Sequence, residues 1–238
     1  MILITRPKEQ SKNLETILGF KGYETYIESL YKIKYLKNRI AYNKNNHYIF
    51  PSIHSVQSLI NSKQIKNFRE ANILAIGKKV KQELISAGCK KIIATFNNSD
   101  ALVDKIKKND FRKYNFIYLC SNIINKDFLR QTDRYQIKLQ KKIIYKTIPV
   151  SKLQKKIIKD LKLGNISGAT FLSKLASDTF LSLSSRYNCL SSSKNINIYC
   201  ISQRVAAPFI QKRFSSVYIA PKPNEDALIQ SIKKRHFK

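Results

Sequence analysis

The sequence predicts an α/β protein built from two similar domains, each a doubly wound parallel sheet flanked by helices. The first observation is that short apolar runs alternate with amphipathic segments along all 238 residues, as expected when crossover helices bury both faces of a sheet. The second is an internal repeat, because residues 73–108 and 198–234 share one order: strand, turn, amphipathic segment, strand, and a helix opening with Asp-Ala-Leu. A repeat of this length indicates two domains of one plan rather than a solenoid.

The individual elements follow from apolar runs and their boundary residues. Pro7 suits the first turn of the first helix, and Gly22 suits the position after its end. Residues 31–46, rich in Lys, Arg and Asn, have the least strand or helix character, and a second crossing is expected near residues 147–149. We therefore predict one domain from residues 1–33 and 148–238 and another from residues 36–145. Strands are predicted at residues 2–5, 23–27, 48–50, 73–76, 91–95, 116–120, 142–147, 169–172, 196–201 and 217–220.

The formal net charge of +30, from 45 Lys and Arg against 15 Asp and Glu, is unusual. Such a charge fits binding of nucleic acid, an anionic membrane or a polyanionic small molecule. Lys, Ile and Asn are all heavily used, however, as drift in an A+T-rich genome would produce. The basic residues are also scattered along nearly every predicted helix, whereas a nucleic-acid footprint gathers them in a stripe. We therefore favour compositional drift, and the lack of a membrane-length apolar run or a signal-peptide pattern predicts a cytoplasmic protein.

Metal and disulfide chemistry have no support in the sequence. His47, His54 and His236 do not have the spacing of metal ligands. The cysteines show no CxxC spacing, and we expect them to be buried, reduced thiols. They are Cys89, Cys120, Cys189 and Cys200.

Two duplicated pairs of residues follow predicted strands, where open parallel sheets bind their ligands. Gly77 and Ser202 each start a helix, whose free N–H groups suit a carboxylate or phosphate, although either residue could simply form a tight turn. Ser52 and Ser173 each end a Phe-x-Ser step and could instead only cap the next helix. Because Gly77 belongs to no GxGxxG or P-loop motif, a nucleotide site is not expected.

Tyr145, in the run Ile-Ile-Tyr-Lys-Thr-Ile-Pro, lies where the chain is predicted to cross back between domains. A phenol can donate a proton to a leaving hydroxyl, but tyrosine is more often only a strand aromatic. Its position, rather than its chemistry, makes Tyr145 a candidate catalytic residue.

The order of these motifs resembles that of the uroporphyrinogen-III synthase family. The first half has Ile-Thr-Arg-Pro at residues 4–7, Phe-x-Ser ending at Ser52, Ala-Ile-Gly ending at Gly77, Ala-Gly at residues 87–88, and Ser99 before a helix. The second half has Ile-Tyr-Lys-Thr around Tyr145, Thr-Phe-Leu-Ser at residues 170–173, and Cys-Ile-Ser followed by Arg-Val-Ala at residues 200–206. The resemblance covers nearly the whole chain, and order and spacing carry it. The departures are Val80, Arg204 and Val205 where some members have threonines, Ser121 in place of a usual glycine, and Ser167 in place of a frequent aspartate.

The resemblance implies two flavodoxin-like domains joined by a two-stranded crossing. It implies a monomeric enzyme that cyclises hydroxymethylbilane to uroporphyrinogen III without a cofactor or metal, losing water and inverting the D ring. Tyr145 would assist departure of the hydroxyl, and the substrate's acetate and propionate groups would be bound by Arg6, Ser52, Gly77, Ser99, Ser173 and Ser202.

The expected partner is thus a linear tetrapyrrole, and no obligate nucleic acid or membrane is expected. A transient contact with the enzyme that supplies the substrate is compatible with this interpretation. Two alternatives remain open on the sequence alone. One is a non-enzymatic two-domain α/β binding protein, and the other is a basic nucleic-acid-binding protein.

Overall fold

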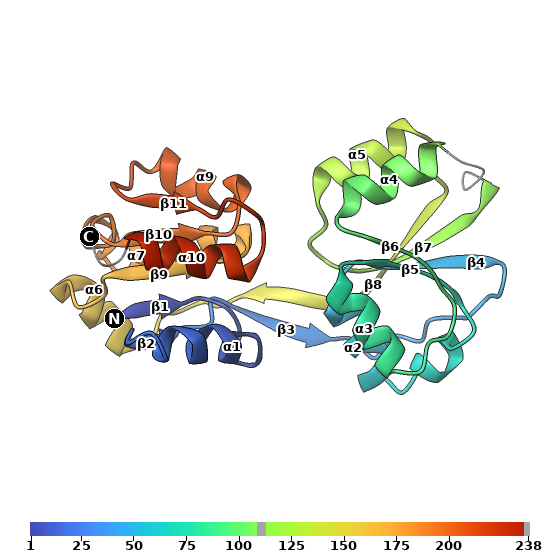
Figure 1. Ribbon diagram of the computed structural model, residues 1–238, viewed down its shortest axis with the longest axis horizontal. Helices are drawn as coiled ribbons and strands as arrows, with labels where there is room; N and C mark the ends of the chain where they lie inside the picture. Colours follow the sequence, from blue (N-terminus) through green and yellow to red (C-terminus); the bar gives the residue numbers. More distant parts are fainter. Residues whose placement is uncertain (109–112, 236–238) are drawn as a thin grey trace. The chain divides into compact units, whose positions relative to one another are not determined.

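A computed structural model describes residues 1–108 and 113–235 of the chain (Figure 1). The chain divides into two compact units, one formed by Met1–Lys32 with Ile148–Lys238 and the other by Ile33–Thr147. The two boundaries fall within strands β3 (Tyr31–Tyr35) and β8 (Leu139–Pro149), which neighbour each other in one sheet. Among the described residues, no helix has both the length and the apolar character needed to cross a membrane.

Unit 1 contains a five-stranded sheet in the order β11-β10-β9-β1-β2, and all neighbouring strands are parallel. Renumbered along the chain, this order is 2-1-3-4-5, which is the flavodoxin-like arrangement. The predicted fold class is therefore confirmed for this unit. The strands are β1 (Ile2–Ile4), β2 (Thr25–Ile27), β9 (Gly168–Phe171), β10 (Asn197–Cys200) and β11 (Val217–Ile219).

Helices cover both faces of the unit 1 sheet. Leu14 of α1 (Lys8–Gly19) and Leu228 of α10 (Glu225–Arg235) belong to one buried cluster with strand residue Ile2. On strand β9, Phe171 packs against Phe180 of α7 (Lys174–Arg186) and Phe209 of α9 (Gln203–Gln211), at ring-centroid distances of 5.3 and 4.6 Å. The remaining helices, α6 (Lys155–Leu163) and α8 (Leu190–Ser193), contact each other.

Unit 2 contains a six-stranded sheet in the order β3-β8-β7-β4-β5-β6. The neighbouring pairs β8-β7, β7-β4, β4-β5 and β5-β6 are parallel. Along β4, Tyr48 and Phe50 enter one buried cluster and Ile49 enters the cluster on the opposite face. Apolar residues therefore alternate between two buried faces, which explains why this strand reads as a continuous apolar run. The further strands are β4 (Asn46–Phe50), β5 (Asn72–Ile76), β6 (Ile92–Phe96) and β7 (Asn115–Ser121).

The helices of unit 2 also form two layers (Figure 1). One layer contains α2 (Ile53–Asn61), the short 3₁₀ helix η1 (Ile65–Phe68) and α3 (Lys78–Ser86), whose apolar residues share a cluster with Tyr48. The other contains α4 (Ser99–Lys108) and α5 (Lys126–Arg134), packed over Ile49. This is the three-layer arrangement that alternating strands and helices predict.

The repeated segments occupy matching places in the two sheets. The elements β5-α3-β6-α4 and β10-α9-β11-α10 each form one edge of a sheet, and β4 and β9 lie next to them. The pair β7-β8 in unit 2 corresponds to β1-β2 in unit 1, which comes first in the chain instead of last. One unit is therefore a circular permutation of the other.

Strand β3 was not predicted, because residues 31–46 were expected to have the least regular structure. Its sequence Tyr-Lys-Ile-Lys-Tyr alternates, with Lys32 and Lys34 exposed and Tyr31 buried. Lysines on one side are common in a strand at the edge of a sheet, where they discourage pairing with other chains. The lysines made this segment look like a loop, although the period of two indicated a strand.

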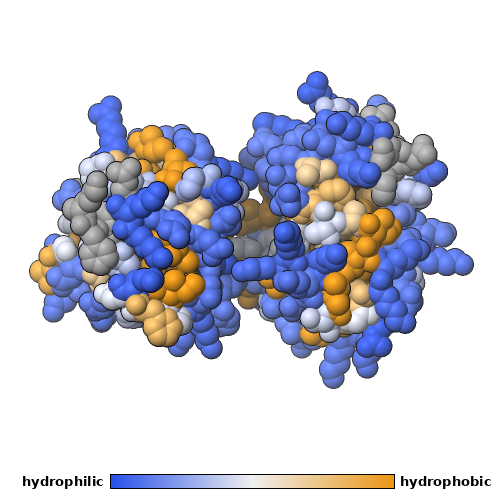
Figure 2. Space-filling view, viewed as in Figure 1, coloured by the Kyte–Doolittle hydropathy of each residue, from blue (hydrophilic) through white to orange (hydrophobic). Residues whose placement is uncertain are grey.

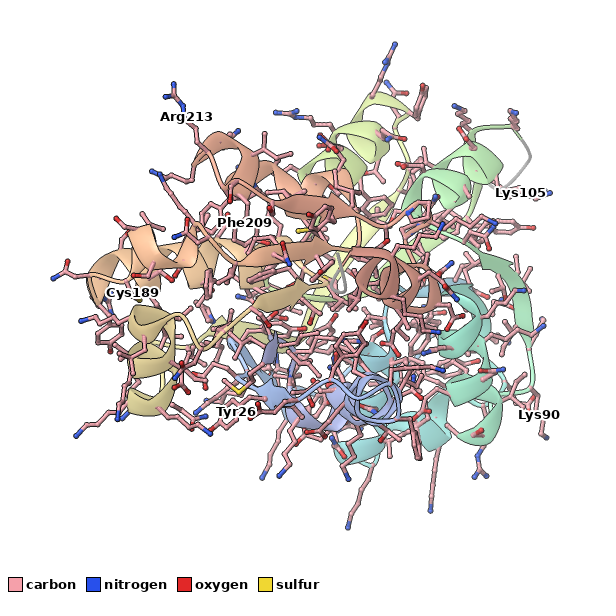
Figure 3. All side chains as sticks on the ribbon, turned by 60° about the vertical axis from the view of Figure 1, so that its left-hand side comes forward. Tyr26, Lys90, Lys105, Cys189, Phe209 and Arg213 are labelled. Atoms are coloured by element: carbon pink, nitrogen blue, oxygen red, sulfur yellow. The ribbon has the colours of Figure 1, made fainter. Side chains whose placement is uncertain are left out.

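The basic side chains are spread over the surface. Hydrophilic residues cover much of the visible face in Figure 2, with smaller apolar patches between them. Lys90, Lys105 and Arg213 extend outward from separate parts of the chain, whereas Phe209 and Cys189 are buried (Figure 3). This pattern fits the scattered charge that the sequence indicated. His236 lies outside the described residues.

Candidate active site

The carboxyl edge of the unit 2 sheet gathers four of the predicted site residues. Ser52 follows β4, Gly77 follows β5, Ser99 follows β6, and Tyr145 lies within β8. The chain reverses its direction of strand addition between β4 and β7, and open α/β sheets bind ligands at such a switch point. Ser52 lies at this point, so the topology itself favours it.

Tyr145 and Ser52 are in direct contact. The Tyr145 hydroxyl donates to the Ser52 Oγ at 3.1 Å. The tyrosine ring belongs to the buried core of unit 2, with only 6% of the residue exposed. The core thus fixes the ring, and the contact with Ser52 orients the hydroxyl.

Ser52 is the N-cap of α2, as the alternative interpretation of this residue expected. Its Oγ accepts from the His54 backbone N–H at 3.0 Å, and Ser55 completes a capping box. Capping does not exclude a role in the site, since the same oxygen accepts from Tyr145. The positive end of the helix dipole therefore lies beside the tyrosine oxygen, where it favours negative charge.

Burial raises the pKa of Tyr145, and this effect exceeds the lowering caused by the hydrogen bond with Ser52. Cys120 and Tyr35 raise it slightly further. Tyr145 is therefore protonated at neutral pH and can act as a proton donor.

His54 and Tyr35 are neighbours of Tyr145 that the sequence did not single out. The rings of His54 and Tyr145 lie 5.6 Å apart between centroids. The Tyr35 hydroxyl pairs with His54 Nδ1 at 3.0 Å and donates to Gln57 Oε1 at 2.6 Å. The available signal was the position of His54 two residues after the Phe-x-Ser step, but Tyr35 lies on the strand that was not predicted.

A second group of polar side chains fixes the end of β8. Asn122 Oδ1 accepts from the Thr147 backbone N–H at 2.8 Å and from the Ser121 hydroxyl at 3.0 Å. The Ser121 and Thr147 hydroxyls lie 3.2 Å apart. These bonds join the ends of β7 and β8 two residues beyond Tyr145.

Gly77 and Ser99 differ in what their positions require. Gly77 has φ +100°, which side-chain-bearing residues rarely adopt, and it is the N-cap of α3. Ser99 was expected just before a helix but is the first residue of α4, and Asn98 caps that helix by accepting from the Ala101 N–H at 2.8 Å. The Ser99 side chain instead lies near the hydroxyl of buried Tyr118, whose pKa it lowers against the larger effect of burial.

The carboxyl edge of the unit 1 sheet carries Arg6 after β1, Ser173 after β9 and Ser202 after β10. Ser173 caps α7 by accepting from the Ala176 N–H at 3.2 Å, whereas Ser202 starts α9 without a side-chain capping bond. The hydroxyl of Tyr31 interacts with both Arg6 and Ser173. These contacts lower its pKa, and burial, the larger effect, raises it.

Arg6 is already engaged within unit 1. Its Nη1 donates to Glu225 Oε2 at 2.7 Å, and Nη2 donates to Gln10 at 3.2 Å. Asn13 donates to the other Glu225 oxygen at 2.7 Å. An anionic ligand at Arg6 would thus share the guanidinium with Glu225.

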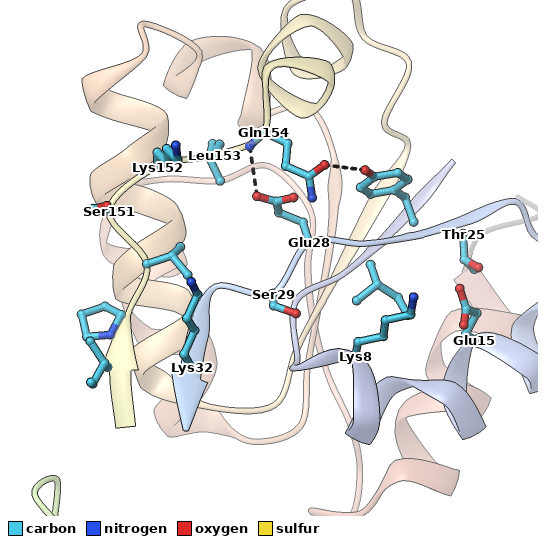
Figure 4. A pocket seen from close by; sticks show the side chains of 15 residues that line it. Lys8, Glu15, Thr25, Glu28, Ser29, Lys32, Ser151, Lys152, Leu153 and Gln154 are labelled. Atoms are coloured by element: carbon cyan, nitrogen blue, oxygen red, sulfur yellow. Dashed lines mark hydrogen bonds between the residues drawn. The ribbon is translucent and has the colours of Figure 1, made fainter. Parts of the chain in front are cut away.

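Unit 1 also has a groove of about 830 Å³ that contains none of the predicted site residues (Figure 4). Glu28 is 3% exposed there, and its Oε1 accepts from the Gln154 N–H at 3.1 Å. Burial raises the Glu28 pKa, while hydrogen bonding with Gln154 lowers it. Tyr26 donates to Gln154 Oε1 at 2.7 Å. We assign this chain of bonds to joining β2 and the start of α6.

All four cysteines are free and buried, as predicted, and burial raises the pKa of Cys89 and Cys120 to about 11. Within residues 1–108 and 113–235, no group of three or more His, Cys, Asp or Glu side chains is arranged to hold a metal ion.

The fold defines a two-domain α/β protein, and the predicted site residues at the carboxyl edges of its sheets are mainly neutral hydrogen-bonding groups. Residues 12–230 match the family described as uroporphyrinogen-III synthase HemD, and the chain belongs to this family. Its members are cyclising lyases of tetrapyrrole biosynthesis, and the match therefore favours an enzyme with a tetrapyrrole substrate over the two alternatives.

Solved structures support the fold. The chain is similar to uroporphyrinogen-III synthetase from Helicobacter pylori 26695, with a TM-score of 0.66 and 16% identity over 98% of both chains. It is also similar to a mutant uroporphyrinogen III synthase from the extremely thermophilic bacterium Thermus thermophilus, with a TM-score of 0.62 and 8% identity over 98% of both chains. No curated protein sequence matches the chain.

Proposed function

We propose that the chain cyclises hydroxymethylbilane to uroporphyrinogen III and that Tyr145 is the proton donor of the reaction. The observation that carries this proposal is the Tyr145 hydroxyl, held at 3.1 Å from Ser52 at the switch point of a parallel sheet. A buried, protonated phenol beside a helix N-terminus can give its proton to a leaving hydroxyl and is then stabilised as phenolate.

The proposed chemistry balances without a metal or cofactor. The carbon–oxygen bond of the substrate's hydroxymethyl group breaks as the Tyr145 proton moves to that oxygen, and water leaves. The resulting cationic methylene carbon on ring A bonds to the carbon of ring D that already carries the bridge to ring C, which gives a spiro intermediate. That bridge bond then breaks, and the freed bridge carbon on ring C bonds to the unsubstituted α-carbon of ring D, so that ring D is inverted. A proton released from the ring carbon then returns to the Tyr145 phenolate, so that one water is lost in total.

Ser52 is proposed to have two functions in this step. It accepts the Tyr145 hydrogen bond before proton transfer and caps α2 throughout. Once Tyr145 is a phenolate, the serine hydroxyl can rotate and donate to it. Charge-assisted hydrogen bonds of this kind are about twice as strong as neutral ones.

The remaining predicted residues are proposed to bind the acetate and propionate groups of the substrate. Helix starts present backbone N–H groups that suit carboxylates, and the net charge of +30 favours a polyanionic ligand. The residues are Arg6, Gly77, Ser99, Ser173 and Ser202. Among them, Ser202 is the strongest candidate, because its hydroxyl makes no capping bond.

A single assay tests the proposed function. Hydroxymethylbilane is generated in place by its preceding enzyme, the product is oxidised, and the type I and type III porphyrin isomers are separated by chromatography. We expect the type III isomer to predominate. Formation of only the type I isomer, which arises spontaneously, would contradict the proposal.

Two finer expectations stay predictions. One is that the protein works in the cytoplasm, and the other is that it makes a transient contact with the enzyme that supplies its substrate. Co-sedimentation of the two purified enzymes, with and without substrate, would test the contact.

A further inference from the structure

His54 has three separate contacts around Tyr145. Its backbone N–H donates to Ser52 Oγ at 3.0 Å, and that oxygen also accepts from Tyr145 at 3.1 Å. Its ring lies against the Tyr145 ring, with 5.6 Å between centroids and 51° between planes. Its Nδ1 pairs with Tyr35 at 3.0 Å. Changes at His54 therefore reach the ring and the hydrogen-bond acceptor of Tyr145 together.

The Tyr35 contacts determine the position of one proton on His54. The Tyr35 hydroxyl has a single proton and donates it to Gln57 Oε1 at 2.6 Å. Its oxygen must then accept at 3.0 Å from His54, so Nδ1 carries a proton. This bond is the same whether the imidazole is neutral or charged. His54 can therefore gain a second proton at Nε2 without any rearrangement of Tyr35.

We propose that His54 is a positioning residue of the dehydration step, and that its imidazolium, oriented by Tyr35, stabilises the phenolate formed when Tyr145 gives up its proton. The inference rests on the proposed function of Tyr145. It adds a residue that acts through Tyr145 and explains why a buried phenol is able to lose a proton.

Three side chains that shift the pKa of Tyr145 are neutral at physiological pH. Tyr35 on β3, Cys120 on β7 and Ser52 before α2 are the groups that shift the pKa of Tyr145. None of these three carries a positive charge, whereas His54, whose ring contacts the Tyr145 ring, can supply one. Gln57, on the same helix face, has no ionisable group.

The sign of the expected pH dependence follows from the charge. Protonated His54 favours the phenolate, so kcat should be highest at low pH and fall as His54 loses its proton. Histidines titrate between about pH 5 and 8. A His54→Asn variant keeps an N–H donor for Tyr35 but has no titrating ring. We expect its kcat to be about tenfold lower at pH 6, with little change in KM and without this pH-dependent fall.

His47→Asn is the matched control. His47 lies on β4 of the same unit, near the amino end of the strand, and its ring lies 4.1 Å from that of Tyr114. Ser52 follows the opposite end of this strand, so removal of His47 tests the general cost of losing a histidine from this unit. We expect the His47→Asn variant to keep the wild-type pH profile, whatever its melting temperature.

A second measurement does not depend on activity. The ¹⁵N chemical shifts of the His54 ring in the intact protein report which nitrogen is protonated, and we expect Nδ1–H in the neutral form. Tyr35→Phe should weaken this preference. A neutral His54 protonated at Nε2 would overturn the inference, as would a His54→Asn enzyme with the wild-type kcat and pH profile.

The two proposals fail in different ways. If the wild-type protein forms only the type I isomer, the proposed function fails, and the positioning role of His54 fails with it. If the wild-type protein forms the type III isomer but His54→Asn matches it at every pH, only the His54 inference fails.

Discussion

At the scale of single residues, Tyr145 divides into two parts with different functions. Its ring belongs to the core cluster, and its hydroxyl reaches Ser52. Tyr145→Phe should therefore retain the packing and remove the acid. We expect formation of the type III isomer to fall by about 100-fold, and the free energy of unfolding to fall by only about 1 kcal/mol. Isomer analysis and urea denaturation measure the two effects.

Tyr48→Phe is the control for this prediction. Tyr48 is fully buried in the same cluster, and its hydroxyl bonds the backbone of Asn43. Losing that hydroxyl should cost similar stability and leave turnover unchanged. Equal turnover of the Tyr145→Phe and wild-type enzymes would remove Tyr145 from the reaction.

Gly77 is constrained by its backbone rather than by the space around it. A Cβ atom at this position would meet Val80 Cγ2 at 3.8 Å, an ordinary contact, but the φ of +100° is unfavourable for alanine. We expect Gly77→Ala to lower the free energy of unfolding by at least about 1 kcal/mol, as measured in urea.

Gly19 provides the contrast for Gly77. It is the last residue of α1, and an added Cβ would have no atom within 4 Å. Gly19→Ala should stabilise the protein by up to about 1 kcal/mol, because glycine is the less favourable residue in a helix. Similar effects of the two substitutions would show that the backbone at Gly77 is not held at positive φ.

At the scale of elements, two matching helix starts differ in their capping. Ser173 accepts from the Ala176 N–H, whereas the Ser202 side chain makes no capping bond at α9. We expect Ser173→Ala to cost about 1 kcal/mol of stability and Ser202→Ala about half of that or less. Thermal unfolding of both variants measures the difference, and equal losses would contradict it. A loss of turnover in Ser202→Ala at unchanged stability would support substrate binding there.

Buried elements could be predicted from the sequence because their signal is a continuous apolar run. Strands β4, β5 and β7 are buried on both faces, and their positions were predicted to within a few residues. Strand β3 was missed because lysines fill its exposed positions. The repeat predicted two similar domains, but the permutation depends on which strands pair across the sheet, and no local pattern contains that information.

The candidate site was predicted only in part, because contacts between distant segments are not contained in any local sequence pattern. Ser52 and Tyr145 were selected by their places after and within apolar strands, but their 3.1 Å contact joins residues far apart in the chain. His54 had no metal-ligand spacing, and its relation to Tyr145 required both α2 and β8 to be placed. Tyr35 lies on the missed strand β3. Sequence reasoning therefore found the residues that carry motifs and missed those that surround them.

At the scale of the whole molecule, the two units depend on chain continuity differently. Unit 1 needs both ends of the chain, since β1 pairs with β9 and the N-terminal amine of Met1 donates to the Asn165 carbonyl and the Ser167 hydroxyl. Unit 2 is one continuous segment, with both of its core clusters inside it. Unit 2 is thus inserted between the two segments of unit 1, and its own core clusters contain no residue from unit 1.

A fragment of residues 31–149, which contains β3 and β8 entire, should therefore fold by itself. Its sheet has all six strands, and helices cover both faces, so both core clusters of unit 2 stay whole when the rest of the chain is removed. We expect a cooperative urea transition, a dispersed NMR spectrum, and the same protonated Nδ1 at His54 as in the full chain. A separate peptide of residues 1–32 should be unfolded, because β1 and β2 form no stable sheet without β9. An unfolded 31–149 fragment would mean that its core requires residues from unit 1.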